Sequence, residues 1–311
     1  MRGMELMVEI RNLTKSFGDR TAVGGFTFDV AKGECFGLLG PSGAGKTTLL
    51  KMLSGTLKPQ EGELFLLGLS MTSSLREIKS RIGVASQEHG LDLELTAFEN
   101  LLVYSRYFGL TRNAAEDRIR ELMKVVKMDD RLHQVAESMT FPHQKRLALA
   151  RALLNDPDLL ILDEPASLLN SQARSWTWDF IRRQKQEGRT LLLTTQDRVE
   201  AETVCDRVGL VHKGRLLVVG SPMDLIREHW GNKVVELTTT ESERSYFLNR
   251  LKERKMDHHV FGSRILFRLQ SETELDPMKS FHSSSLTVRK PDLNDVFLKL
   301  TDVDLREERQ A

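Results

Sequence analysis

Two stretches near the start of the chain alternate hydrophobic and polar side chains. Val8–Thr14 and Phe26–Val30 both follow this period of two, which is typical of strands with one buried face. Gly18-Asp19 interrupts the alternation and indicates a turn. The pattern predicts a small antiparallel sheet at the beginning of the chain, and Glu63–Leu67 reads as another strand.

Other strands are predicted from apolar runs that do not alternate. Leu159–Leu162 and Thr190–Thr195 are such runs, as expected for parallel strands that are buried on both faces. These strands, with helices between them, predict an α/β fold whose core is a parallel sheet flanked by helices. Further strands are expected at Cys35–Leu39, Arg81–Gln87, Val208–Val211 and Arg215–Gly220, the last two as a hairpin.

The spacing of apolar residues becomes helical between Thr96 and about Gln134. Phe98, Leu101 and Leu102 recur on one helical face, and Lys145–Leu154 then reads as a further strong helix. A crossover between parallel strands needs only about a dozen residues. The excess length predicts a helical subdomain over about residues 88–155.

The pattern of predicted strands and helices changes again beyond Gly231. Short alternating strands and charged helices follow one another, which fits a small α+β domain over residues 231–311, after a first domain over 1–230. His258 and His259 are expected on a loop of this second domain, where we find no pattern that indicates chemistry.

A glycine-rich turn lies between the strand at Cys35–Leu39 and an amphipathic helix. Its sequence fits G-x-x-x-x-G-K-[ST], the P-loop motif that binds a nucleoside triphosphate with its magnesium ion. Glycines let the backbone wrap closely round an anion, and the helix N-terminus adds positive charge. We expect Lys46 to reach the β- and γ-phosphates and the Thr47 hydroxyl to hold Mg²⁺. The turn comprises Gly40, Pro41, Ser42, Gly43, Ala44, Gly45, Lys46, Thr47 and Thr48.

Two carboxylates follow the buried run Leu159–Leu162. Asp163 and Glu164 therefore stand at the carboxyl end of a predicted parallel strand, where ligands bind in open α/β sheets. In this position Asp163 is expected to hold Mg²⁺, and Glu164 to orient or deprotonate a water molecule.

Composition narrows the class of function. The 311 residues contain 45 Lys and Arg against 44 Asp and Glu, a net charge of +1, so nucleic acid is not expected as a partner. The two cysteines, Cys35 and Cys205, imply neither a disulfide framework nor a metal cluster. No apolar run approaches the length of about 18 residues that a membrane-spanning helix requires.

The order of these motifs resembles the ATP-binding subunit of ABC transporters across residues 6 to about 225. The resemblance implies ATP and Mg²⁺ as cofactors. It also assigns Phe17 to stacking on adenine, Gln87 to the Q-loop, which contacts nucleotide and metal, and Gln196 to the position of a catalytic switch histidine. The matching residues are Phe17, Gly40–Thr48, Gln87, Leu159–Asp163 and Glu164.

The resemblance also implies partners. Two such subunits would pair head to tail, each ATP lying between one P-loop and the signature motif of the other subunit. Residues 232–305 are similar to the C-terminal extension of drug-export and nodulation-type ATPases, which pair with ABC-2 permeases. This similarity implies a peripheral subunit on the cytoplasmic face of the cell membrane that drives export through the helical segment near Gln87–Leu110.

Three positions depart from the family pattern. Met139–His143 replaces the signature Leu-Ser-Gly-Gly-Gln, although Thr140 keeps a hydroxyl and His143 offers a compensating donor. Pro142 lacks the N–H that such a segment would offer to phosphate. Asn170 stands where the family has Asp in its D-loop, and Gln196 cannot carry a proton as histidine can.

Three functions therefore remain open at this point. One is an ATPase subunit that drives a permease, with slow hydrolysis. Another is a non-hydrolytic ATP-binding scaffold or regulatory subunit that pairs with a competent homologue. The third is a soluble ABC-type ATPase in repair or translation, although such proteins usually carry two cassettes or a long coiled-coil insert, and this sequence has neither.

Overall fold

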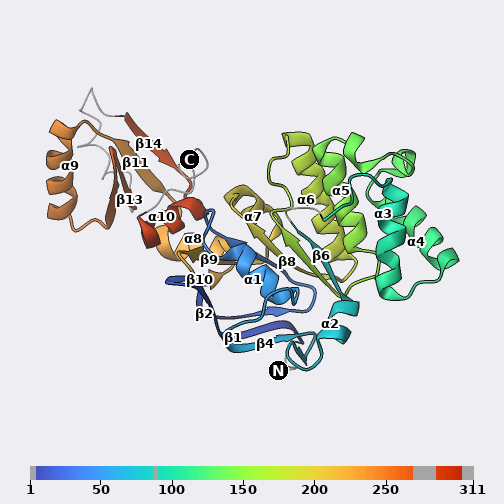
Figure 1. The fold of residues 1–311 in the computed structure, drawn as a ribbon. Helices are drawn as coiled ribbons and strands as arrows, with labels where there is room; N and C mark the ends of the chain where they lie inside the picture. Colours follow the sequence, from blue (N-terminus) through green and yellow to red (C-terminus); the bar gives the residue numbers. More distant parts are fainter. Residues whose placement is uncertain (1–4, 87–89, 269–284, 303–311) are drawn as a thin grey trace. The chain divides into compact units, whose positions relative to one another are not determined.

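A computed structural model describes residues 5–86, 90–268 and 285–302. The chain divides into two compact units, Met1–Gly220 and Ser221–Ala311, each with its own sheet and core. Figure 1 labels most of the helices and strands of both units. Gln87, the expected Q-loop residue, lies outside the described residues.

The first sheet is antiparallel, as the alternating pattern predicts. Its order is β2-β1-β4-β5, and its buried face is lined by residues such as Val8, Ile10 and Phe26. β1 and β2 form a long hairpin whose tip is the Gly18-Asp19 turn. The strands are β1 (Leu6–Phe17), β2 (Arg20–Ala31), β4 (Glu61–Leu66) and β5 (Leu69–Ser70).

The second sheet is the predicted parallel core. Its order is β10-β9-β3-β8-β7-β6, and every neighbouring pair is parallel except the β9–β10 hairpin. β3, β7 and β8 are buried along their whole length, which explains their continuous apolar sequences. The strands are β3 (Cys35–Leu39), β6 (Ile82–Ala85), β7 (Leu159–Asp163), β8 (Thr190–Thr195), β9 (Arg207–His212) and β10 (Arg215–Gly220).

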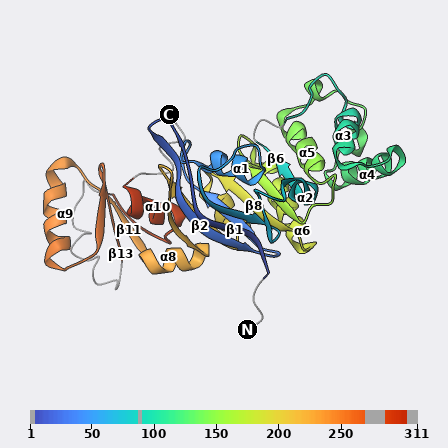
Figure 2. The same cartoon turned by 60° about the horizontal axis from the view of Figure 1, so that its bottom comes forward.

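Helices cover this sheet. The two views place α1 beside the antiparallel sheet, and α3, α4 and α5 together as a separate helical group (Figures 1 and 2). These three helices lie within residues 88–155, the range for which we predict a helical subdomain. The helices of the first unit are α1 (Lys46–Leu53), α2 (Leu75–Arg81), α3 (Ala97–Ser105), α4 (Arg112–Val125), α5 (Phe141–Ala152), α6 (Ser171–Gln186) and α7 (Arg198–Val204).

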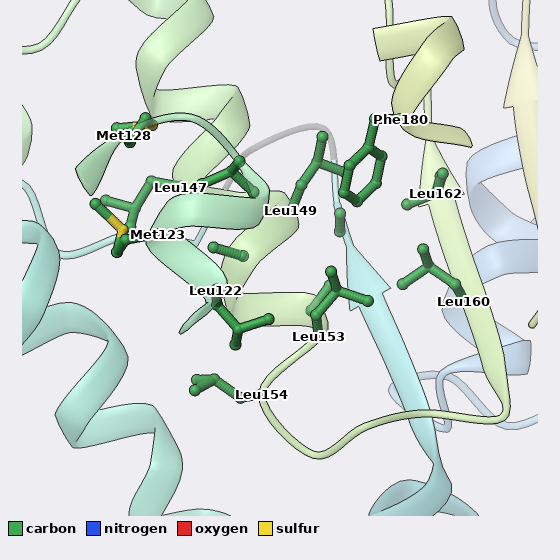
Figure 3. Close-up of a cluster of buried hydrophobic side chains, with 14 of the residues drawn as sticks. Leu122, Met123, Met128, Leu147, Leu149, Leu153, Leu154, Leu160, Leu162 and Phe180 are labelled. Atoms are coloured by element: carbon green, nitrogen blue, oxygen red, sulfur yellow. The ribbon is translucent and has the colours of Figure 1, made fainter. Parts of the chain in front are cut away.

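Helix α5 joins the helical group to the sheet. Figure 3 shows Leu147 beside Met123 on one side, whereas Leu149 and Leu153 lie towards Leu160 of β7. One continuous core thus contains side chains from α4, α5, α6 and β7. The helix begins at Phe141, four residues before the strong helical pattern, because Pro142 occupies its first turn, where proline needs no N–H partner.

The second unit contains an antiparallel sheet of order β12-β13-β11-β14. The expectation that His258 and His259 lie on a loop is wrong, because both belong to β12 and pair with β13. Helix α8 belongs to this unit and packs on α10, where Lys299 lies over the ring of Trp230. The elements are α8 (Pro222–Trp230), β11 (Val234–Thr238), α9 (Glu241–Glu253), β12 (His258–Phe261), β13 (Arg264–Arg268), β14 (Ser285–Arg289) and α10 (Leu293–Thr301).

None of the described helices combines the length and the apolar character that a membrane span requires.

Candidate functional site

The glycine-rich turn connects β3 to α1 at the carboxyl edge of the parallel sheet. Gly45 is the N-cap of α1 with φ at 109°, and a Cβ there would lie 1.9 Å from the carbonyl oxygen of Ala22. A Cβ at Gly40 would lie 2.1 Å from the carbonyl oxygen of Val211. Only glycine fits at these two positions, since any side chain would collide with backbone.

Lys46 is the buried cation of this turn. Its ammonium donates to the carbonyl oxygens of Gly40 at 2.7 Å and Pro41 at 2.9 Å. The same nitrogen lies 3.5 Å from the Glu164 carboxylate, although the two residues are far apart in sequence. The fold therefore brings the P-loop lysine and the acid after β7 into one site.

Asp163 lies between two hydroxyl groups. The Thr194 hydroxyl donates to its carboxylate at 2.5 Å, and the Thr47 hydroxyl lies 3.5 Å from the same oxygen. β7 and β8 are parallel neighbours with Asp163 opposite Thr194, which explains the shorter contact. A carboxylate and a hydroxyl at this spacing are oxygen ligands of the kind that Mg²⁺ prefers.

Glu164 adopts an unusual backbone conformation, with φ at 50°. Its carbonyl oxygen accepts a hydrogen bond of 2.6 Å from the ammonium of Lys145, on α5. Burial lowers the pKa of Lys145, and the nearby carboxylates of Glu164 and Glu200 act in the opposite direction. Lys145 thus ties the helical group to the residue that follows β7.

The remaining expected ligands surround this centre. Ser42 and Gly43 are exposed on the turn, Ala44 is buried, and Thr48 is half-buried on α1. Phe17 lies at the tip of the β1–β2 hairpin with 53% of its surface exposed, and the Lys15 ammonium lies 5.6 Å from the centre of its ring. Phe17 is therefore a surface ring and not a core residue.

Comparison with known proteins identifies the family. A Nod factor export ATP-binding protein I from Burkholderia lata is 38% identical over 309 residues, covering 96% of this chain and 98% of that protein. The chain belongs to the ATP-binding subunits of ABC transporters. A Nod factor export ATP-binding protein I from Rhizobium meliloti is 37% identical and covers 96% of this chain and 89% of that protein. The resemblance seen in the sequence is confirmed.

Other comparisons agree with this family. The family model described as ABC transporter matches residues 23–167. A solved structure of an ATP-binding subunit of an ABC transporter aligns with a TM-score of 0.65 at 26% identity, covering 71% of this chain and 92% of that one. A dimeric ATP-binding cassette, MJ0796, solved with ADP and Pi, shares the fold with a TM-score of 0.64 at 24% identity, covering 69% and 98%.

The signature segment of this ABC subunit has its own local structure. The Thr140 hydroxyl and Nδ1 of His143 are hydrogen-bonded at 2.8 Å across the first turn of α5. Phe141 is 37% exposed, and the Lys145 ammonium lies 5.5 Å from the centre of its ring. The hydroxyl that the family would offer to a partner's phosphate is thus engaged within this subunit.

Asn170 and Gln196, the other two positions that depart from the family pattern, also lie at defined places in the structure. Asn170 is the N-cap of α6, and its side-chain oxygen accepts from the Ala173 N–H at 2.9 Å, a function that Asn and Asp share. Gln196 follows β8 and is half-buried. The carbonyl oxygen of the preceding residue, Thr195, accepts a hydrogen bond of 3.2 Å from the Gly40 N–H, so the strand end next to the switch position contacts the P-loop.

Sequence reasoning missed three residues of this site. Thr194 and Lys145 contact the two acids, as described above, and Glu200 on α7 is 2% exposed and accepts from the Trp178 indole at 3.2 Å. Burial raises the pKa of Glu200 to about 7, and the charge of Glu164 acts in the same direction. Of the three, only Thr194 could have been found from the sequence, because it is a polar residue near the carboxyl end of a predicted buried strand.

Proposed function

We propose that this chain binds MgATP as the ATP-binding subunit of a membrane exporter. The observation that carries the proposal is the convergence of the P-loop with the end of β7. Lys46 lies 3.5 Å from Glu164, and Thr47 lies 3.5 Å from Asp163. Four residues of the predicted chemistry thus meet at one edge of the sheet, where α/β proteins bind ligands.

Mg²⁺ fits the residues present. It is usually held by one or two protein oxygens together with phosphates and water, which matches the Thr47 hydroxyl and the Asp163 carboxylate. When bound, the ion neutralises charge on the phosphates. The protein's own part is to hold the phosphates with Lys46 and the turn, to stack Phe17 on the base, and to orient water with Glu164.

Partners follow from the family. ABC ATP-binding subunits dimerise and work with membrane permease subunits, and the similar Burkholderia and Rhizobium proteins are named for Nod factor export. We assign this chain to an ABC-2 permease, at the cytoplasmic face of the membrane. Exposed apolar residues of the helical segment, Leu93, Val103 and Tyr107, offer a surface on which a permease can dock.

An ATPase assay of the complex tests this function. The chain is purified from membranes with its permease, and turnover is compared with that of a Glu164→Gln variant. We expect slow hydrolysis that depends on Glu164. Equal rates in the two proteins would show that this subunit does not drive transport by hydrolysis.

A specific observation favours a second candidate, a non-hydrolytic scaffold or regulatory subunit. Thr140 is bonded to His143, Pro142 removes an N–H from the first turn of α5, and Gln196 cannot carry a proton. These features alter the parts that close the site, whereas the parts that bind nucleotide within the subunit are intact. Such a subunit would bind ATP tightly and pair with a competent homologue.

The variant Gln196→His separates the two candidates. If the switch position limits hydrolysis, the histidine raises turnover of the purified complex. No gain would assign the defect to the signature segment, and restored turnover only in a mixed dimer would identify the scaffold. A fully active wild-type homodimer would exclude the scaffold.

A further inference from the structure

The hairpin between β1 and β2 brings an aromatic ring and a cation together. Phe17 and Arg20 are paired across the two strands at its tip. Residues directly opposite on antiparallel strands project their side chains from the same face. The Arg20 guanidinium therefore lies on the same side of the ribbon as the Phe17 ring.

On that side Arg20 contacts the P-loop. Its Nη2 donates to the carbonyl oxygen of Gly43 at 2.9 Å. A Cβ at position 43 would lie 3.0 Å from this nitrogen, and the φ of Gly43 is 71°. The missing side chain at Gly43 thus lets the guanidinium lie close against the turn.

Among the described residues, no acid neutralises the charge of Arg20. In the described part of the chain, no carboxylate lies within 4.0 Å of its side chain, and the residue is exposed. A guanidinium has several N–H donors, and one of them makes the bond to Gly43. The others are available for a ligand at the outer side of the turn.

Lys46 contacts the same turn from the buried side. It is buried and already contacts Gly40, Pro41 and Glu164. Arg20 is thus a second cation at the P-loop, and it is reached from solvent. Arginine suits this place because its planar guanidinium makes paired, charge-assisted hydrogen bonds to phosphate oxygens.

We propose that Arg20 is a further nucleotide-binding residue, which holds the phosphate chain of the ATP in the P-loop from the solvent side. The inference rests on the proposed function, because it assumes that ATP occupies this turn. It adds that one hairpin contacts both ends of the ligand, with Phe17 at the base and Arg20 at the phosphates.

Nucleotide titrations with the full-length protein test this role. ATP, ADP and adenosine compete against a fluorescent ATP analogue for wild type, Arg20→Gln and Arg20→Lys. Glutamine keeps a donor for the Gly43 carbonyl but removes the charge. The matched control is Arg11→Gln, since Arg11 lies on β1, is 58% exposed and pairs with Glu9 and Glu63.

We expect Arg20→Gln to weaken ATP and ADP about tenfold, the size of one lost charge-assisted hydrogen bond. Adenosine affinity should not change, because adenosine has no phosphate. ATP affinity should also fall less steeply with salt than in wild type. Arg20→Lys should keep only part of the affinity, because lysine retains the charge but not the paired hydrogen bonds. Arg11→Gln should keep all of it.

Two results would overturn the inference. Unchanged ATP affinity in Arg20→Gln would show that Arg20 makes no contact with phosphate. An equal loss for ATP and adenosine would show that Arg20 only shapes the hairpin beside Phe17. Failure of the proposed function is distinct from both, because then the wild-type protein itself would bind no ATP.

Discussion

The Lys46 ammonium lies 3.5 Å from the Glu164 carboxylate, and the two side chains are only 5% and 6% exposed. The P-loop cation is thus paired with the acid expected to act on water. Because phosphates also need the Lys46 charge, incoming ATP competes with Glu164 for it. The pair would thus link nucleotide binding to release of the Glu164 carboxylate.

This competition predicts the behaviour of Glu164→Gln. Removing the negative charge frees Lys46 for phosphate, so ATP affinity should rise severalfold. Hydrolysis should fall by about a hundredfold or more, because a positioned general base contributes at least that much. Equilibrium binding of a fluorescent ATP analogue and phosphate release measure the two effects, and weaker ATP binding by the variant would contradict the competition.

We predict that the Thr194 hydroxyl lowers the Mg²⁺ concentration that ATP binding requires. It donates to Asp163 at 2.5 Å and fixes the carboxylate beside Thr47. Thr194→Val keeps the shape but removes the donor, so the Mg²⁺ concentration needed for half-maximal ATP binding should rise about tenfold. Thr72→Val, at an exposed position, is the control. An unchanged Mg²⁺ requirement would mean that Asp163 needs no such support.

Glu200 predicts a pH dependence of stability. Its pKa is about 7 in the folded chain, against an ordinary value of 4.5, chiefly because of burial. Between these values the folded state binds more protons than the unfolded state, so this contribution to the free energy of unfolding decreases as pH rises towards 7. It is fully present below about pH 4.5 and lost above about pH 7.

Glu200→Gln should remove this dependence. Relative to wild type, the variant should gain stability between pH 5 and pH 8, by on the order of 3 kcal/mol at most. Urea unfolding at several pH values measures the difference, and Glu202→Gln on the same helix is the control. If the two variants follow the same pH curve, Glu200 is not the titrating group.

We predict that Arg289 stabilises the second unit. Its guanidinium makes two hydrogen bonds of 2.7 Å to the Asp295 carboxylate, which is fully buried. These bonds raise the pKa of Arg289. Arg289→Met would leave a buried charge without its cation, which typically costs about 3 kcal/mol or more.

The measurement uses the full chain, with unfolding followed by circular dichroism. We expect the second unit to melt earlier in Arg289→Met, while ATP binding by the first unit is retained. Arg227→Met is the matched control, since Arg227 is 75% exposed in its pair with Asp224. Equal melting of the two variants would show that the Asp295 carboxylate tolerates the loss.

Much of the fold could be predicted because burial leaves a clear trace in the sequence. β3, β7 and β8 are buried on both faces, and their apolar runs reveal them. β12 left no such trace, because its four residues include two histidines, and pairing with β13 decides its conformation. Local pattern is a weak guide wherever tertiary pairing overrides it.

The candidate site likewise contains residues that the sequence predicts and residues that it does not. Lys46 and Asp163 belong to contiguous motifs, so their residue types and spacing predict their chemistry. The contacts of Arg20, Lys145 and Glu200 join different elements across 19 to 23 residues of sequence. Such contacts depend on how strands and helices pack, and a single sequence does not display that packing.

Helix α5 transmits displacement from the helical group to Glu164. Its leucines share one core with α4 and β7, and its Lys145 bonds to the Glu164 carbonyl. A closely packed interior resists compression and transmits displacement. A load applied to the helical group would thus shift the backbone of Glu164 through α5, without passing through the nucleotide. Helix α5 thus connects the helical group mechanically to the backbone of the buried Glu164.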